Sequence, residues 1–203
     1  MEAKKIMFIG AHPDDIELSC AGLILNLKNK AKEVFCVIAS WGDYGGLVSD
    51  RISEQEKSFT CLRIPEYVNL GWPDTKISVN GENVKKLEEI ISEQNPDLIF
   101  THWPEDTHQD HRSVAEMVRS ICYRKNKNLI YFDSNSSLNF NPNYFESINW
   151  ENKKAILELF KSQINENVYP NILDRAGEKA RWYGMKSGQP SAEGYKIERF
   201  VNG

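Results

Sequence analysis

Two short stretches of the chain concentrate side chains that bind metals or move protons. The stretch AHPDDIE, residues 11–17, places His12 beside the adjacent carboxylates Asp14 and Asp15. The stretch THWPEDTHQDH, residues 101–111, contains the other three of the four histidines: His102, His108 and His111. Catalytic zinc commonly takes three ligands from histidine and carboxylate side chains and leaves one position for water. A further carboxylate and a further histidine would then serve proton transfer and charge stabilisation, so the two stretches indicate a metal-dependent hydrolytic site.

Each stretch taken alone has a simpler explanation. Asp14 followed by Glu17 fits a helix capping box, and Pro13 and Asp15 suit the first turn of a helix. Asp110 would similarly serve as the N-cap of the helix that follows it. The metal-site interpretation is favoured because both stretches occur in one chain, and because the predicted fold brings them to one edge of a sheet.

Alternating strand and helix patterns predict the elements that position these residues. Apolar runs indicate strands at 5–11, 34–40, 67–71, 98–102 and 129–132. Helical periodicity indicates helices at 15–29, 51–63, 83–94 and 112–123. This alternation predicts an α/β fold, a three-layer Rossmann-like sandwich with a mostly parallel sheet. Ligands of such sheets bind beyond the carboxyl ends of the strands. His12 and the second histidine stretch meet there if the first and fourth strands are neighbours.

The rest of the chain is expected to complete the same domain, residues 1–203. Residues 134–150 read as loop with one short strand near Tyr144, followed by helices at 153–163 and 173–183. A chain of 203 residues that is 40% hydrophobic is long and apolar enough for one sizeable core.

Composition and charge argue against several classes of function. The net charge of −4, from 25 basic and 29 acidic side chains, gives no reason to expect a nucleic-acid partner. No apolar stretch reaches 18 residues, so no membrane span is expected. The four cysteines are widely spaced in apolar surroundings, which predicts buried free thiols in a cytoplasmic protein.

The two motifs resemble those of a known family. Residues 11–17 match the form A-H-P-D-D-x-E, and residues 108–111, HQDH, match H-x-D-H. Both forms are those of the zinc-dependent N-deacetylases of the PIG-L/LmbE family. Four further stretches are similar to family segments: 39–46 (ASWGDYGG), 69–77 (NLGWPDTKI), 149–163 (NWENKKAILELFKSQ) and 194–200 (GYKIERF). The resemblance therefore covers nearly the whole chain.

The resemblance implies both an activity and the residues that perform it. The expected reaction is removal of the N-acetyl group from an N-acetylglucosamine-type amino-sugar conjugate. His12, Asp15 and His111 would bind one Zn²⁺ per chain. Asp14 would act as the general base on zinc-bound water, and His108 would stabilise the tetrahedral intermediate.

Four further residues receive supporting roles from the resemblance. Asp110 would orient or tune a histidine, a role that metal sites commonly need. Arg51 and Asp74 would contact sugar hydroxyls. Asp43 is grouped with these substrate contacts, at a position where the family more often has glutamate.

Two other functions remain as alternatives, a metal-dependent phosphoesterase and a non-catalytic sugar-binding module. Few additional acids stand at the strand ends to form a second metal site, which disfavours the phosphoesterase. A competent residue occupies every proposed catalytic position, which disfavours the binding module. The expected partner is a small-molecule amino-sugar conjugate. A homo-oligomer is compatible with this activity, although the sequence identifies no interface.

Overall fold

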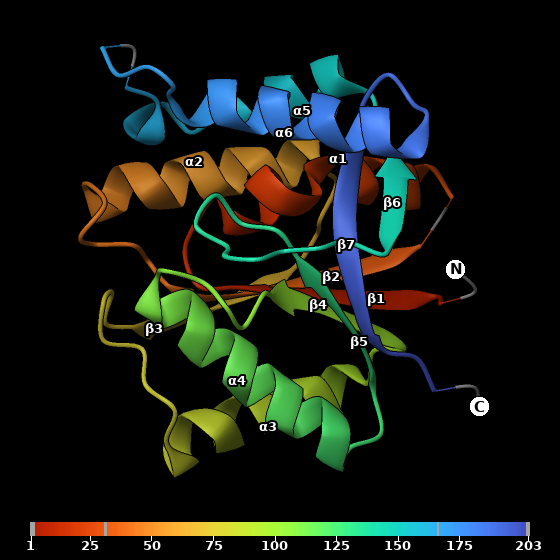
Figure 1. Cartoon of the computed structure of the whole chain (residues 1–203). Helices are drawn as coiled ribbons and strands as arrows, with labels where there is room; N and C mark the ends of the chain where they lie inside the picture. Colours follow the sequence, from red (N-terminus) through yellow and green to blue (C-terminus); the bar gives the residue numbers. More distant parts are fainter. Residues whose placement is uncertain (1–2, 31, 166, 202–203) are drawn as a thin grey trace.

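One mixed sheet of seven strands runs through the computed structural model, which describes residues 3–30, 32–165 and 167–201. The strands lie in the order β3-β2-β1-β4-β5-β7-β6 (Figure 1). Their bounds are β1 (Lys5–Gly10), β2 (Glu33–Ser40), β3 (Tyr67–Trp72), β4 (Leu98–His102), β5 (Asn128–Phe132), β6 (Tyr144–Ser147) and β7 (Ala192–Arg199). The strands β1 to β5 pair in parallel, and β7 is antiparallel to both β5 and β6. The predicted α/β fold with a mostly parallel sheet is confirmed.

Helices cover both faces of this sheet, as right-handed crossovers between parallel strands require (Figure 1). One side carries α1 (Asp15–Asn29), α2 (Val48–Cys61), α5 (Trp150–Leu157) and α6 (Ile172–Ser187). The other side carries α3 (Gly81–Gln94) and α4 (Gln109–Arg124). The sheet is therefore buried between two helical layers, which explains why its central strands are apolar without interruption.

Successive side chains of β1 enter two different hydrophobic cores. Ile6 and Phe8 belong to the core beneath α1 and α2, whereas Met7 and Ile9 belong to the core beneath α3 and α4. All four side chains are fully buried. Because side chains alternate between the faces of a strand, β1 is held from both sides. The carboxyl ends of β1 and β4 consequently form a rigid support for the residues that follow them.

The helix expected at 153–163 is divided into two pieces. The α-helix α5 ends at Leu157, and a separate 3₁₀ turn, η1, covers Lys161–Gln163. Ser162 explains the break, because its backbone N–H and its hydroxyl donate to the two carboxylate oxygens of Glu54, at 2.7 and 2.6 Å. Because of this contact with α2, the helix α5 does not continue to Gln163. Gln163 instead lies at the edge of the candidate site described below.

Two further sequence expectations concern the cysteines and the membrane. All four cysteines are free, but Cys61 is exposed and only the other three are buried. Cys61 lies at the end of α2, where its neighbours Phe59 and Leu62 occupy the inner face. Within the described ranges, no helix is both long enough and apolar enough to span a bilayer.

Candidate metal centre

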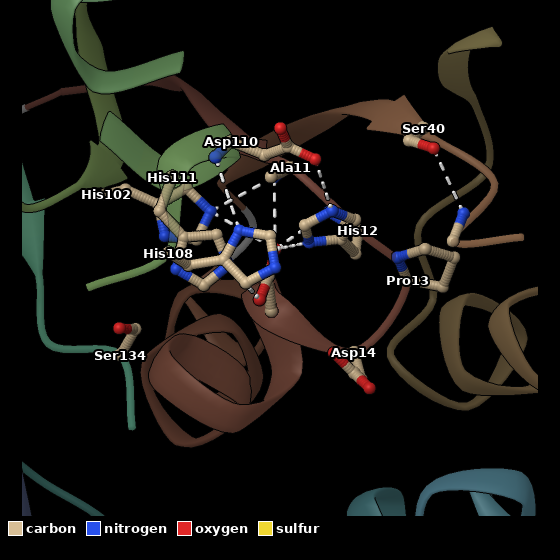
Figure 2. A network of polar contacts seen from close by, with 12 residues as sticks. Ala11, His12, Pro13, Asp14, Ser40, His102, His108, Asp110, His111 and Ser134 are labelled. Carbon is tan, nitrogen blue, oxygen red and sulfur yellow. Dashed lines mark hydrogen bonds and ion pairs between the residues drawn. The ribbon is translucent and has the colours of Figure 1, made fainter. Parts of the chain in front are cut away.

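The four histidines meet at the carboxyl ends of β1 and β4 (Figure 2). This follows from the parallel pairing of β1 with β4, which confirms the neighbouring strands that the sequence analysis required. His12 follows β1 and His102 ends β4, whereas His108 and His111 stand at the start of α4. The ring centroids of His102 and His111 are 3.9 Å apart, those of His108 and His111 4.6 Å, and those of His12 and His108 4.8 Å.

Three overlapping groups of side chains place their donor atoms within 4.8 Å of one another in the described part of the chain. They are His12 with His108 and His111, Asp15 with His102 and His111, and His12 with Asp74 and Asp110. The expected zinc ligands fall in the first two groups. Asp15 lies between the other two expected ligands, with Oδ2 3.5 Å from His12 Nδ1 and Oδ1 3.3 Å from His111 Nε2. The choice of His12, Asp15 and His111 remains a prediction among these combinations.

Two aspartates contact the same nitrogen of the His12 ring. His12 Nε2 lies 3.0 Å from Asp74 Oδ1 and 3.1 Å from Asp110 Oδ2. Burial alone would lower the pKa of His12, but hydrogen bonds with Asp110, Asp15 and Asp74 raise that pKa to about 12. The surroundings of this ring therefore favour positive charge strongly, and the contacts at Nε2 leave Nδ1 facing Asp15.

Asp110 is fixed by the loop that follows β3. Its Oδ2 accepts the backbone N–H of Thr75 at 2.7 Å, and its Oδ1 accepts that of Ile77 at 3.2 Å. Thr75 has a φ of 63°, an unfavourable conformation for a β-branched residue. The loop therefore adopts a strained backbone in the same place where its N–H groups bind Asp110. Such strain persists only where surrounding contacts enforce it, which marks this loop as part of the site.

His111 is oriented by a residue that the sequence analysis did not identify. Its Nδ1 lies 3.1 Å from Asp106 Oδ2, and the same oxygen accepts the hydroxyl of Ser134 at 2.5 Å. Burial would lower the pKa of His111, but Asp15 and Asp106 raise it to about 9. Asp106 stands in the histidine-rich stretch, five residues before His111. Ser134 follows β5, and no local pattern connects it to the motif.

Asp14 occupies the N-cap position of α1, but its side chain does not cap the helix, contrary to the simpler explanation of the first motif. It precedes α1 with a left-handed φ of 91°, and its side chain makes no cap hydrogen bond. Its Oδ2 instead accepts from Arg51 at 3.1 Å, and its N–H donates to Gln55 at 3.3 Å. Glu17 does not complete a capping box either, because it accepts from Gln55 and Ser58.

The contacts of α2 thus set the conformation and the acidity of Asp14. Burial raises the pKa of Asp14 to about 6, and the guanidinium of Arg51 opposes this shift. A carboxylate with a pKa close to neutral is better matched to accepting and returning a proton than an ordinary aspartate.

His108, and not Asp110, caps α4. The Nδ1 atom of His108 accepts the N–H of Asp110 at 3.2 Å. Because Nδ1 acts as an acceptor, the proton of the neutral ring is on Nε2. Burial lowers the pKa of His108, which favours this neutral form. The ring is only partly buried, so a neutral N–H donor borders the open space in front of the cluster.

An open pocket of about 340 Å³ lies in front of these residues. Asp14, His108, Arg51 and Asp74 all line it, together with Tyr44 and Gln163, among others. Both Arg51 and Asp74 therefore line the pocket, although their polar atoms already bind neighbours, and their contact with a substrate stays a prediction. Arg51 donates to Pro13 O at 2.8 Å as well as to Asp14.

Asp43 lies outside the group that lines this pocket. Its side chain is exposed, and its Oδ1 accepts the N–H of Asp74 at 3.3 Å. Asp74 in turn accepts the N–H of Tyr44 through Oδ2 at 3.0 Å. In this structure Asp43 thus helps to hold Asp74 in place by accepting its N–H. Its proposed contact with substrate stays a prediction.

The composition of the cluster fits a divalent cation. Five buried or nearly buried aspartates surround the histidines, namely Asp14, Asp15, Asp74, Asp106 and Asp110. Arg51 is the buried, permanently charged cation in contact with one of them. Buried charge is costly unless it is paired or binds a metal. A nitrogen and oxygen donor set with this excess of negative charge therefore suits zinc.

Comparison with known proteins identifies the family. The family model described as GlcNAc-PI de-N-acetylase, PIG-L, matches residues 7–122. The uncharacterized deacetylase YaiS of Escherichia coli K12 is 32% identical over 170 residues, covering 78% of this chain and 91% of that protein. Diacetylchitobiose deacetylase of Thermococcus kodakarensis is 26% identical over 229 residues, covering 100% of this chain and 85% of that enzyme.

A solved structure shows that the fold is shared as well. N,N'-diacetylchitobiose deacetylase from Pyrococcus horikoshii has a TM-score of 0.87 at 23% identity, covering 97% of this chain and 84% of that one. The match of the family model includes both motifs and the four histidines. This chain belongs to the PIG-L/LmbE family of deacetylases.

Proposed function

We propose that this protein is a zinc-dependent N-deacetylase that hydrolyses the acetamide of an N-acetylglucosamine-type amino-sugar conjugate. One zinc ion per chain would be bound by His12, Asp15 and His111. The observation that carries the proposal is the orientation of the two histidines, His12 and His111, by separate carboxylate partners. Asp110 and Asp74 contact His12, and Asp106 contacts His111. Metal-binding histidines usually have such a partner on the nitrogen that does not bind the metal.

The mechanism divides the chemistry between the ion and two side chains. When bound, zinc supplies a Lewis acid that polarises the carbonyl and lowers the pKa of a bound water to about 7. Asp14 accepts the proton from the attacking water, for which its raised pKa is suited. The oxygen of that water forms the new bond to the carbonyl carbon. Asp14 then returns the proton to the nitrogen as the carbon–nitrogen bond breaks, which leaves a free amine and acetic acid, and the acid loses the second proton of the water to become acetate.

His108 stabilises the negative charge that develops on the carbonyl oxygen. Its neutral Nε2–H borders the pocket, because Nδ1 is engaged by the N–H of Asp110. A fixed donor of this kind stabilises a tetrahedral intermediate without reorganisation during the reaction. Asp110 thus acts twice, since its backbone orients His108 and its carboxylate orients His12.

The substrate class is supported by the pocket and by the relatives. Arg51 and Asp74 are charged groups on the pocket wall that suit sugar hydroxyls. The Thermococcus relative is by its name a deacetylase of an acetylated amino sugar. Its similarity extends over the whole of this chain, which favours an amino-sugar conjugate here.

The test measures acetate release from a panel of N-acetylglucosamine conjugates, with the zinc-loaded protein and after chelation. We expect acetate from at least one conjugate, abolished by chelation and restored by zinc. The variant Asp14→Asn, which keeps the shape of the side chain, should lose more than a thousandfold in turnover while it retains zinc. This loss exceeds the hundredfold to thousandfold effect of removing one oxyanion donor, because the only proton acceptor of the mechanism is removed.

Four outcomes would count against the proposal. Equal acetate release with and without metal would exclude zinc dependence. Zinc binding without acetate from any conjugate would preserve the metal site but reject the reaction. Phosphate release from sugar phosphates in the same assay would favour the phosphoesterase alternative. Binding of the conjugates without turnover would favour the non-catalytic module.

A further inference from the structure

The loop that follows β5 supports the carboxylate partner of a proposed metal ligand. Ser134 donates its hydroxyl to Asp106 Oδ2, the oxygen that lies 3.1 Å from His111 Nδ1. Both Asp106 and Ser134 are buried. Two backbone hydrogen bonds also join this loop to the histidine-rich stretch, from Thr107 N to Ser136 O at 3.0 Å and from Leu138 N to Glu105 O at 2.7 Å. The position of the loop therefore determines where the Asp106 carboxylate stands.

Lys179 of α6 reaches the base of this loop from the helical layer. Its Nζ donates to the backbone oxygen of Ser134 at 2.7 Å and lies 3.4 Å from the backbone oxygen of Asp133. The same nitrogen is 3.1 Å from Asp133 Oδ2. An ammonium group has three protons, so one side chain can serve all three acceptors. The peptide groups on both sides of Ser134 are thus bound to α6 through one residue.

Tyr183, one helical turn after Lys179, makes only part of these contacts. Its hydroxyl donates to Asp133 Oδ2 at 2.5 Å. Residues four positions apart lie on the same face of a helix, so both side chains reach the loop together. Among the hydrogen bonds of the described residues, Tyr183 has none to Ser134. The helix therefore carries one residue that binds only the Asp133 carboxylate and one that also binds the backbone of Ser134.

Attachment of α6 to the sheet is the simpler explanation of Lys179. The ion pair with Asp133 and the hydrogen bond from Tyr183 would be sufficient for that purpose. The shortest of the Nζ distances, however, is the one to the backbone oxygen of Ser134. This contact adds to the attachment a direct hold on the residue that binds Asp106.

We propose that Lys179 is a positioning residue of the metal centre, which fixes the loop after β5 so that Ser134 holds Asp106 against His111. The proposal rests on the proposed function, because His111 is a ligand only if that function holds. Lys179 and Ser134 both lie beyond residues 7–122, the segment that the family model matches. The last helix of the chain would thereby contribute to a site whose proposed ligands all lie within that segment.

The test measures zinc affinity of the full chain by chelator competition, without substrate. Ser134→Ala should bind zinc about 10- to 100-fold more weakly, the usual cost of disturbing a partner of a metal ligand. Lys179→Met should lose about threefold to tenfold, because it acts one residue further from the ligand. Lys179→Arg, which keeps the donors and the charge, should recover most of that loss. Tyr183→Phe is the matched control and should stay within about twofold of the parent, even where it lowers the free energy of unfolding.

A further variant separates positioning from attachment. Lys179→Met leaves the carboxylate of Asp133 without its cation, which could by itself destabilise the fold. Combining Lys179→Met with Asp133→Asn removes that unpaired charge. The double variant should regain stability in urea denaturation but should keep the weakened zinc affinity. Recovery of both quantities together would show that Lys179 only attaches α6, and would overturn the proposal.

A double-mutant cycle tests the route through Ser134. In the Ser134→Ala background, Lys179→Met should weaken zinc binding by less than about twofold, because the residue through which it acts is already missing. Full additivity of the two losses would overturn the proposed route. Equal zinc affinity of Lys179→Met and the parent, with acetate release as expected, would reject the positioning role alone. Absence of acetate release with all zinc affinities as expected would instead reject the proposed reaction and leave the role of Lys179 intact.

Discussion

Two buried clusters of charge contact the same helix, α1, and they differ in their balance. At the start of α1, Asp14 and Asp15 belong to the acid-rich cluster of five aspartates around the histidines. Near its middle, Lys153 and Glu193 form a buried ion pair, with 2.6 Å between Nζ and Oε1. The first cluster has an excess of negative charge, and the second has one charge of each sign.

The ion pair is fully satisfied by the helix into which it is inserted. Glu193 accepts the backbone N–H groups of Gly22 and Leu23 at 3.0 and 2.8 Å. Lys153 donates to the backbone oxygen of Leu18 at 2.8 Å. These contacts tie α5 and β7 to α1, and the cavity beside the pair, about 10 Å³, has room for no more than about one water molecule. The comparison teaches that burial of charge alone does not indicate a binding site, whereas burial of unbalanced charge does.

The largest effect is expected from Asp15→Asn, which separates binding from stability. Removing this carboxylate should weaken zinc binding by more than a hundredfold and deacetylation by at least as much, because a charged ligand is lost. The metal-free variant should lose less than the roughly 3–5 kcal/mol expected from breaking a buried ion pair, because the amide oxygen of asparagine can still accept the N–H groups of Ala11 and His12, although the attraction of the Asp15 carboxylate to His111 and His102 is lost. Chelator competition and urea denaturation of the metal-free protein measure the two quantities.

A marked destabilisation of metal-free Asp15→Asn would break the comparison. It would mean that the acid-rich cluster, like the ion pair, is needed for folding without any cation. Asp110→Asn offers a matched control within the same cluster. It changes a carboxylate that contacts His12 but is not a proposed ligand, so its effect on zinc affinity should be smaller.

Lys153→Met should lower the free energy of unfolding and leave zinc affinity nearly unchanged, which is the reverse of the pattern expected for Asp15→Asn. This change leaves Glu193 charged and without its partner in the core, which typically costs about 3–5 kcal/mol. Zinc affinity of the folded variant should stay within about threefold of the parent, because Lys153 contacts none of the histidines or their carboxylates. Denaturation gives the stability and chelator competition gives the affinity. A double variant, Lys153→Met with Glu193→Gln, should recover part of the lost stability.

The sequence was sufficient for most of the fold and for the place of the site. Strand and helix periods predicted the alternation from β1 to β5, and parallel pairing of β1 with β4 then brings His12 to His102. These predictions succeed because the periods are local and the crossover rule is general. The division of α5 from η1 was missed because it depends on the tertiary contact between Ser162 and Glu54.

The residues that orient the site were less predictable. The buried face of α2 carries Arg51 and Gln55, which bind Asp14 from about forty positions along the chain. Hydrophobic periodicity cannot identify a helix face that is buried and polar. The capping box at Asp14 failed for the same reason, since a distant helix and not the local turn binds its side chain. Asp106 was missed because its carboxylate resembles any acid near the start of a helix.

A narrower effect, confined to turnover, is expected from His108→Ala. The loss of one pocket donor to the developing oxyanion should reduce kcat by about a hundredfold to a thousandfold. Zinc affinity should change little, because neither nitrogen of His108 contacts Asp15 or Asp106 in the hydrogen bonds of the described residues. Steady-state kinetics and chelator competition test the two statements. Full turnover with zinc bound would exclude the role given to His108.

The smallest effect, and the one that sharpens the role of α2, is expected from Arg51→Leu. The guanidinium of Arg51 lowers the pKa of Asp14, so its removal must raise that pKa. Asp14 acts as a base only when deprotonated, so the acidic limb of kcat/KM should move to higher pH. The loss of activity should therefore be greater at pH 6 than at pH 8, about fivefold greater for a displacement of one pKa unit, because Asp14 with a pKa of about 6 is already half protonated at pH 6. If Arg51 served only to bind a sugar hydroxyl, KM would rise equally at both pH values and the limb would not move.

Arg51→Lys, which keeps the charge, should leave the limb closer to its original position. A limb unchanged in both variants would assign Arg51 to the substrate and leave Gln55 as the contact from α2 that fixes Asp14.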